Sequence, residues 1–120
     1  LFRSTRKEGC SISTKKAPLE GSIVTGILKY LNSLEGCRAV KVAGSAQKSG
    51  EPDIDACYKG RALKLEVKRP GGPGPTPLQI EIMRKWEKAY ALTHTVRSVQ
   101  DVKDIISTLE EIEEGREWRL

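Results

Sequence analysis

The chain has 120 residues and a mass of 13.3 kDa, and 31% of its residues are charged and 38% hydrophobic. This length allows one domain with a real core, but not a catalytic domain plus a separate recognition domain. No apolar run approaches the roughly 20 residues of a membrane span, and no secretory signal is visible. A formal net charge of +5 suggests a polyanionic partner.

The three cysteines, Cys10, Cys37 and Cys57, are an odd number at wide spacing and include no Cys-x-x-Cys pair. This pattern argues against a disulfide framework and against a thiolate zinc site. The single histidine, His94, excludes a zinc site of the His-Glu-x-x-His type. We therefore expect a protein of a reducing, cytoplasmic compartment.

The chain divides into a basic arm, one domain and a short tail. Residues 1–17 show no periodicity and carry five cations against Glu8, which predicts a flexible arm, either simply solvated or in contact with DNA. Residues 18–115 contain every periodic segment and form the predicted domain. Residues 116–120 are expected to be a C-terminal tail.

The first half of the domain predicts a helix and three strands. The helix follows Pro18 and ends near Gly36. Its apolar stripe consists of Leu19, Ile23, Ile27 and Leu31. Residues 37–43 are β-prone, and residues 53–59 and 62–69 alternate on either side of a Lys59-Gly60-Arg61 turn, which predicts a hairpin.

A second helix is predicted to begin after Thr76 and to continue to about residue 92. Thr76 stands at the cap, Pro77 at the first helical position and Gln79 at the third, as in a capping box. The residues expected to form its buried stripe are Leu78, Ile82, Trp86 and Ala89.

A strand over residues 93–99 and a last helix capped by Ser98 complete the predicted elements. Their order is helix, three strands, helix, strand, helix. This order predicts an α/β fold in which helices flank a mixed central sheet.

One group of residues carries chemistry. In the second arm of the hairpin Glu66 and Lys68 share a strand face, about 7 Å apart along the backbone. If the hairpin pairs around its turn, Asp53 lies beside them, so two carboxylates converge on one hard cation such as Mg²⁺. Lys68 would then orient water or stabilise a phosphoryl transition state. The alternative is an exposed surface ion pair between Glu66 and Lys68.

Four motifs in a fixed order distinguish these alternatives. They are Ser49-Gly50-Glu51-Pro52-Asp53-Ile54, Leu65-Glu66-Val67-Lys68, Thr76-Pro77-Leu78-Gln79 and Val96-Arg97-Ser98. Together they resemble the PD-(D/E)XK nuclease superfamily and, within it, the VRR-NUC (virus-type replication-repair nuclease) domains. The resemblance covers roughly residues 20–106.

The resemblance implies a restriction-endonuclease-like core and hydrolysis of DNA phosphodiesters with Mg²⁺, for which Mn²⁺ would substitute. It implies that Asp53, Glu66 and the backbone carbonyl of Val67 bind the metal and that Lys68 is the catalytic lysine. It also brings in Glu20, as a further acidic residue of the metal site, and Gln79, close to it. From the residues alone Glu20 could instead be an exposed first-turn glutamate.

Other residues near the motifs leave two roles open. Arg97 either contacts phosphate or is a solvated strand cation, and Asp55 either supports the metal site or lies at the surface. Trp86 is expected in the core. Cations predicted to contact the DNA backbone are Lys48, Lys59, Arg61, Lys64, Arg69, Arg84, Lys85 and Lys88.

Stand-alone VRR-NUC proteins look like dimeric Holliday-junction resolvases, and a twofold enzyme suits paired cuts in a four-way junction. We therefore expect a homodimer acting on branched DNA. The alternatives are a flap-cleaving or restriction-like nuclease, a DNA-binding module that has lost catalysis, and an unrelated small α/β domain.

Overall fold

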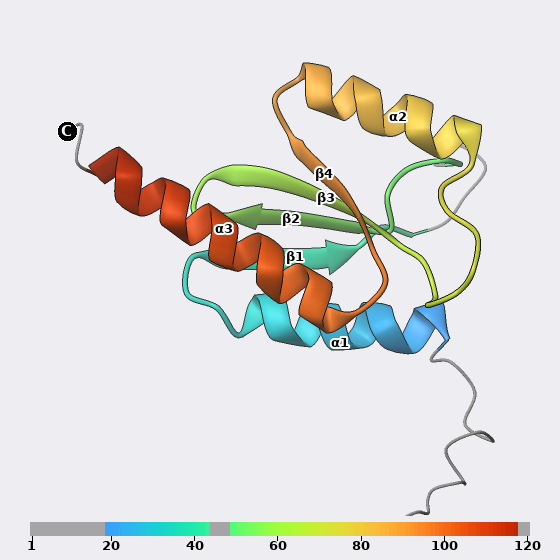
Figure 1. The fold of residues 1–120 in the computed structure, drawn as a ribbon, viewed down its shortest axis with the longest axis horizontal. Coiled ribbons are helices and arrows are strands. Elements are labelled where there is room, and N and C mark those ends of the chain that lie inside the picture. Colours follow the sequence, from blue (N-terminus) through green and yellow to red (C-terminus); the bar gives the residue numbers. More distant parts are fainter. Residues whose placement is uncertain (1–18, 44–48, 118–120) are drawn as a thin grey trace, which may run out of the picture.

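The computed structural model describes residues 19–43 and 49–117 (Figure 1). The predicted basic arm, residues 1–17, lies outside the described residues. The first two residues of the predicted tail still belong to the last helix, and the rest of it lies outside the described residues. Each helix of the described part is too short or too polar to cross a membrane.

Seven elements follow one another in the predicted order. They are α1 (Glu20–Asn32), β1 (Cys37–Lys41), β2 (Ile54–Tyr58), β3 (Arg61–Val67), α2 (Pro77–Lys88), β4 (Leu92–Val96) and α3 (Val99–Glu117). The predicted α/β class with a mixed sheet is therefore confirmed. The strand predicted over residues 93–99 ends too late, because Ser98 accepts a hydrogen bond from the backbone N–H of Asp101 and so starts α3 at Val99.

The four strands form one sheet in the order β1-β2-β3-β4. β1, β2 and β3 are antiparallel neighbours, whereas β4 runs parallel to β3 after the crossover through α2. The predicted hairpin pairs Ile54 with Leu65 and Tyr58 with Arg61. Lys59 and Gly60, both at positive φ, make the tight turn between the two strands.

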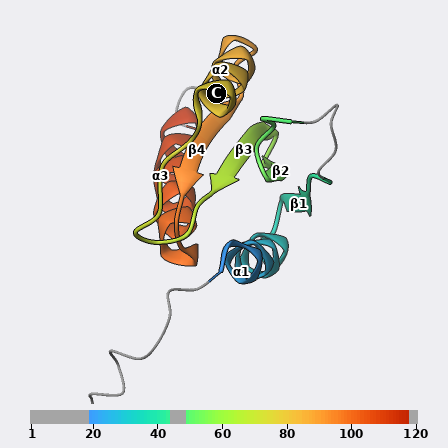
Figure 2. The same cartoon turned by 90° about the vertical axis from the view of Figure 1, so that its right-hand side faces the viewer.

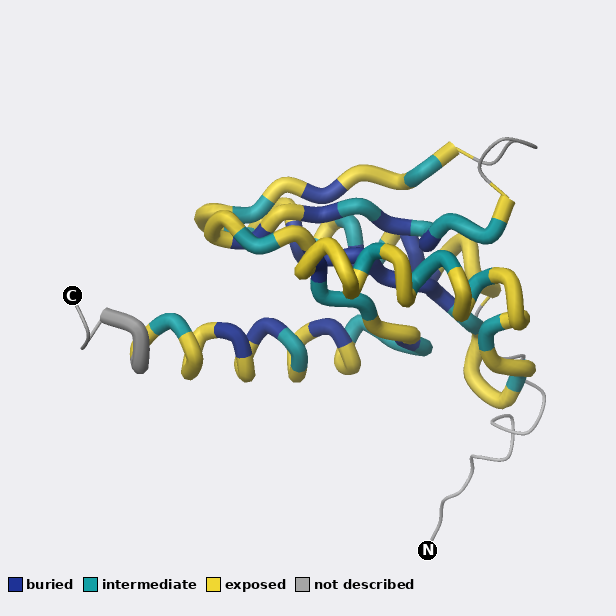
Figure 3. Tube along the Cα trace, turned by 90° about the horizontal axis from the view of Figure 1, so that it is seen from above, coloured by how far each residue is buried: buried dark blue, intermediate teal, exposed yellow. Residues whose placement is uncertain are grey.

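The helices cover both faces of the sheet. α1 and α3 lie on one face and α2 on the other (Figure 2). The apolar core fills the space under α1 and α3, and Figure 3 shows its buried positions in the central strands and on one side of α3. Residues of this core include Ile27, Leu31, Ile54, Tyr58, Leu63, Leu65, Val67, Val96, Val102 and Ile106.

β3 is buried on both faces. Leu63, Leu65 and Val67 face the core, as the alternation predicts, while Lys64 and Glu66 point to the opposite side. Those two charged residues are also buried. The surface ion pair considered from the sequence is therefore wrong for Glu66, because the face that carries it is not open to solvent.

The predicted buried stripe of α2 is wrong. No residue of this helix, which the structure describes in full, is buried, and Leu78 remains 46% exposed. The helix also ends at Lys88, before the predicted residue 92. The reason is that α2 packs over the polar face of β3 rather than over the apolar core, so its apolar residues gain only partial cover.

Candidate active site

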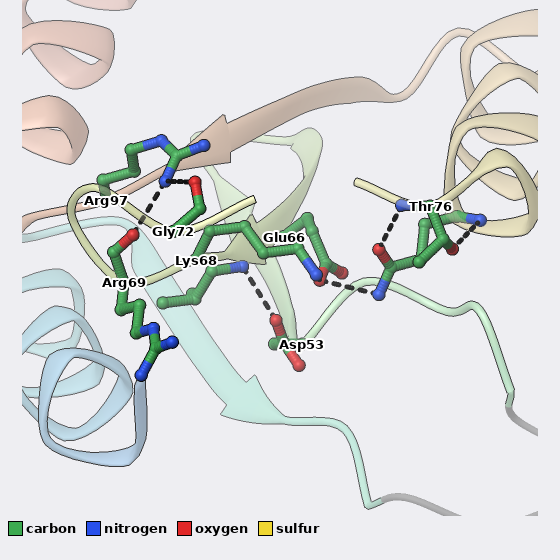
Figure 4. Close-up of polar contacts among 9 residues, drawn as sticks. Asp53, Glu66, Lys68, Arg69, Gly72, Thr76 and Arg97 are labelled. Atoms are coloured by element: carbon green, nitrogen blue, oxygen red, sulfur yellow. Dashed lines mark hydrogen bonds and ion pairs between the residues drawn. The ribbon is translucent and has the colours of Figure 1, made fainter. Parts of the chain in front are cut away.

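Asp53 stands immediately before β2, next to the end of β3. Its backbone carbonyl accepts a hydrogen bond from Val42 N–H at 2.8 Å, which continues the pairing of β1 with this segment. Its side-chain Oδ2 accepts a hydrogen bond from Val67 N–H at 2.7 Å (Figure 4). The carboxylate is thus held across the gap between the two strands at the point where their ladder ends.

Glu66 is the most buried charged residue of the site, at 2% exposure. Its Oε2 accepts a hydrogen bond from Gln79 Nε2 at 2.9 Å and lies 3.3 Å from Lys68 Nζ. Its Oε1 is buried and has no hydrogen-bond partner among the described residues. A buried carboxylate oxygen without a donor is costly, and a cation bound to this atom would offset that cost.

The environment of Glu66 raises its pKa from 4.5 to about 7. Burial is the largest cause, because it disfavours the charged form, and the neighbouring carboxylate of Asp53 adds to it. Lys68 acts in the opposite direction by stabilising the ionised form. The site therefore holds more negative charge than its own lysine compensates.

The donor atoms suit a hard divalent cation. Asp53 and Glu66 supply carboxylate oxygens from neighbouring strands, and Val67 supplies a backbone carbonyl. Because Val67 N–H points toward Asp53, and the N–H and C=O of a strand residue lie on the same side, that carbonyl is directed to the side of β3 on which Asp53 lies. Oxygen ligands of this kind are those that Mg²⁺ accepts, with water filling the remaining positions.

Glu20 is not brought into this group. It is the exposed first residue of α1. Among the described residues no three His, Cys, Asp or Glu side chains lie together in a group that could hold a metal ion. Glu20 therefore does not complete a trio of acidic side chains with Asp53 and Glu66 in this structure.

Gln79 forms the predicted capping box and also contacts Glu66. Its Oε1 accepts a hydrogen bond from Thr76 N–H, while Thr76 Oγ1 accepts one from Gln79 N–H, so the predicted capping box is present. The Nε2 of the same amide donates to Glu66. The start of α2 thus orients a carboxylate of the site.

Sequence reasoning missed a second set of contacts on the same face. Lys64 Nζ lies 3.8 Å from the centre of the Trp86 ring and 2.9 Å from Asp55 Oδ1. Trp86 Nε1 donates to Glu51 Oε1 at 2.9 Å. Trp86 therefore does not belong to the apolar core, and it tethers the segment that carries Asp53 to α2.

The structure also corrects the predictions about Lys64 and Arg97. Lys64 is buried and paired with Asp55, so it is not free to contact a DNA backbone, and Asp55 faces Lys64. Two features of the sequence pointed to this arrangement: Lys64 shares a strand face with Glu66, and the predicted hairpin sets Asp55 opposite Lys64. Arg97 likewise does not project freely, because its Nη1 donates to the carbonyls of Arg69 and Gly72.

Neither a protein-family model nor a curated protein matches the sequence. Four chains among the solved structures match the fold. One, described as "VRR_NUC domain protein", has a TM-score of 0.62 and 20% identity, and the match covers 78% of this chain and 89% of that one. Another, described as "VRR_NUC domain", has a TM-score of 0.62 and 24% identity, with 73% and 94% covered.

These matches confirm the structural resemblance that the four motifs predicted. The chain has the fold of VRR_NUC domain proteins, with its mixed four-stranded sheet and flanking helices, at low sequence identity. At such identities the likeness concerns the fold, and the activity has to be argued from the residues of the site.

Proposed function

We propose that this chain is a metal-dependent nuclease that hydrolyses phosphodiester bonds in DNA. The observation that carries the proposal is the buried Oε1 of Glu66, which has no partner in the described part of the chain and lies on a carboxylate beside Asp53 and Lys68. A site that served stability alone would satisfy this oxygen with a donor. The VRR_NUC fold supports the same conclusion.

Asp53, Glu66 and the Val67 carbonyl would hold the cation, which we take to be Mg²⁺, with Mn²⁺ as a substitute. A divalent ion at this place neutralises charge on the scissile phosphate and makes water a better nucleophile. Gln79 binds Oε2 of Glu66, so Oε1 is the oxygen that would be left for the cation. Val67 N–H holds one oxygen of Asp53 in the same way.

Lys68 is the residue that we assign to the reacting phosphate. Its side chain is only 14% exposed and reaches Glu66 at 3.3 Å, so it lies at the rim of the carboxylates with one side open. An ammonium group there stabilises the charge that develops on the phosphate and can orient water for attack. Glu20 stays a candidate for this site only if α1 approaches it when substrate binds.

The substrate that we propose is branched DNA, in particular a four-way junction, cut by a homodimer. The net charge of +5 supports a polyanionic substrate, and contacts to the phosphate backbone position a protein without reading sequence. A flap or a restriction-like duplex target is the alternative within the same chemistry. The free thiols of Cys37 and Cys57 support a reducing, cytoplasmic location.

The test offers the purified protein a labelled four-way junction, a flap and a linear duplex, each with Mg²⁺, Mn²⁺ or chelator. Cleavage should need metal, and Lys68→Ala should abolish it while Mn²⁺ binding, measured by calorimetry, is retained. Asp53→Asn should lose both DNA cleavage and Mn²⁺ binding. Lys29→Ala, which changes an exposed lysine in the last turn of α1, is the matched control and should cleave normally.

Two results would contradict the proposal. Cleavage that persists in chelator or in Lys68→Ala would exclude the mechanism. A folded protein that binds Mn²⁺ and junction DNA but cleaves none of the three substrates would instead indicate a DNA-binding module. The ranking of the three DNA shapes decides between junction, flap and duplex specificity without affecting the metal chemistry.

A further inference from the structure

The segment between β3 and α2 begins with a tight turn. Gly72 N–H donates to the carbonyl of Arg69 at 3.2 Å, with Pro70 and Gly71 between them. Gly71 has φ +76°, so the pattern of proline at the second position and positive φ at the third is that of a type II turn. Residues 70–75 contain only glycine and proline and form no helix or strand.

Arg97 binds this turn at both ends. Its Nη1 donates to the carbonyl of Arg69 at 2.7 Å and to that of Gly72 at 3.0 Å (Figure 4). Arg97 is itself fixed, because it directly follows β4 and its backbone N–H donates to Asp101 Oδ2 at 2.8 Å. One guanidinium therefore connects the turn to the start of α3.

The turn matters because both ends of its segment enter the candidate site. Lys68 directly precedes it, and Lys68 N–H donates to the carbonyl of Val96, the neighbour of Arg97. Beyond residue 75 the chain enters the capping box of α2, from which Gln79 reaches Glu66. A shift of the turn would therefore move Lys68 and Gln79 relative to the carboxylates.

We propose that Arg97 is a positioning residue: by binding both carbonyls of the Arg69–Gly72 turn it fixes Lys68 against Glu66. Its consequence for catalysis rests on the proposed nuclease function, whereas the clamp on the turn does not. This assignment differs from both roles considered from the sequence. Arg97 acts on the backbone of its own chain and touches neither phosphate nor metal.

The experiment compares Arg97→Ala and Arg97→Lys with Arg38→Ala, a change of an exposed arginine of β1, as control. Hydrogen exchange followed by mass spectrometry should be faster for residues 69–76 in Arg97→Ala, with the β3 and α3 amides unchanged. Lys68 should also be acylated faster by an amine reagent, with the 68% exposed Lys85 as internal reference. Arg97→Lys, which keeps a donor, should be intermediate.

In the cleavage assay Arg97→Ala should lower kcat about tenfold to a hundredfold, with KM and the salt dependence of DNA binding nearly unchanged. A phosphate contact would instead raise KM and reduce the salt slope by about one, and that result would overturn the assignment. Unchanged exchange and unchanged Lys68 reactivity would overturn it as well. If the wild-type protein cleaves no DNA, these last two measurements still decide whether the clamp exists.

Discussion

Replacing Glu66 by glutamine tests the electrostatics of the site directly. The change keeps the shape of the side chain and an acceptor for Gln79, but it removes the buried charge. In the metal-free protein, ionised Glu66 is disfavoured because its folded-state pKa is raised from 4.5 to about 7, chiefly by burial. One pKa unit corresponds to about 1.4 kcal/mol, so the ionised side chain costs the fold about 3 kcal/mol.

The sign of the pH dependence follows from proton binding. Between pH 4.5 and about 7 the folded protein keeps the proton on Glu66 while the unfolded chain has released it. The free energy of unfolding of the wild type therefore falls as pH rises through this window. Glu66→Gln has no such proton, so its stability relative to wild type should increase by about 3 kcal/mol from below pH 4.5 to above pH 7.

The measurement is urea unfolding in chelator, followed by circular dichroism across the pH range. Glu111→Gln, a change of an exposed glutamate on α3, is the control and should differ from wild type by a nearly constant amount. Adding Mn²⁺ at high pH should stabilise the wild type and leave Glu66→Gln little affected, because binding to the folded state alone raises stability. A pH-independent difference between Glu66→Gln and wild type would refute the raised pKa.

Three further changes test the packing around the site, each by urea unfolding. Gly50→Ala should lose about 1–2 kcal/mol, because Gly50 has φ +86° and an added Cβ would lie 2.8 Å from Leu78 Cγ. Trp86→Phe keeps an aromatic ring over Lys64 but loses the hydrogen bond to Glu51, so the free energy of unfolding should fall by about 1 kcal/mol. Thr76→Ala removes the N-cap acceptor of α2, also at about 1 kcal/mol. A stability equal to wild type in any variant would contradict the role given to that contact.

The sequence predicted what is decided locally. The hairpin followed from alternation and a turn at Lys59, and the start of α2 from the spacing of Thr76 and Gln79. The same alternation placed Glu66 and Lys68 on one strand face. Pairing of the two hairpin strands then sets Asp53 beside Val67, whose N–H binds its carboxylate. Each of these features depends on residues close in the chain or on the register of one hairpin.

Features that depend on distant packing were not predictable in this way. The apolar pattern of α2 indicates that one side of the helix is covered. It does not indicate that this side packs against the polar face of β3. The contact of Trp86 with Lys64 follows from that choice of face. Arg97 binds backbone carbonyls, which carry no sequence signature at all. The place of Glu20 depends on how α1 sits against the sheet, which its own residues do not determine.

Because α2 covers Glu66, the ionised carboxylate destabilises the metal-free protein and can bind a cation. On a solvent-exposed strand face, Glu66 and Lys68 would form an ordinary surface ion pair, and the pKa of Glu66 would shift little. Once α2 lies over β3, Gln79 fixes one oxygen of Glu66 and solvent is excluded from the other. The free energy lost by ionising that carboxylate in the metal-free protein is then recovered when a cation binds, because the ligands are already in place. Stability without metal and affinity for metal should therefore change in opposite directions when the cover of Glu66 is altered.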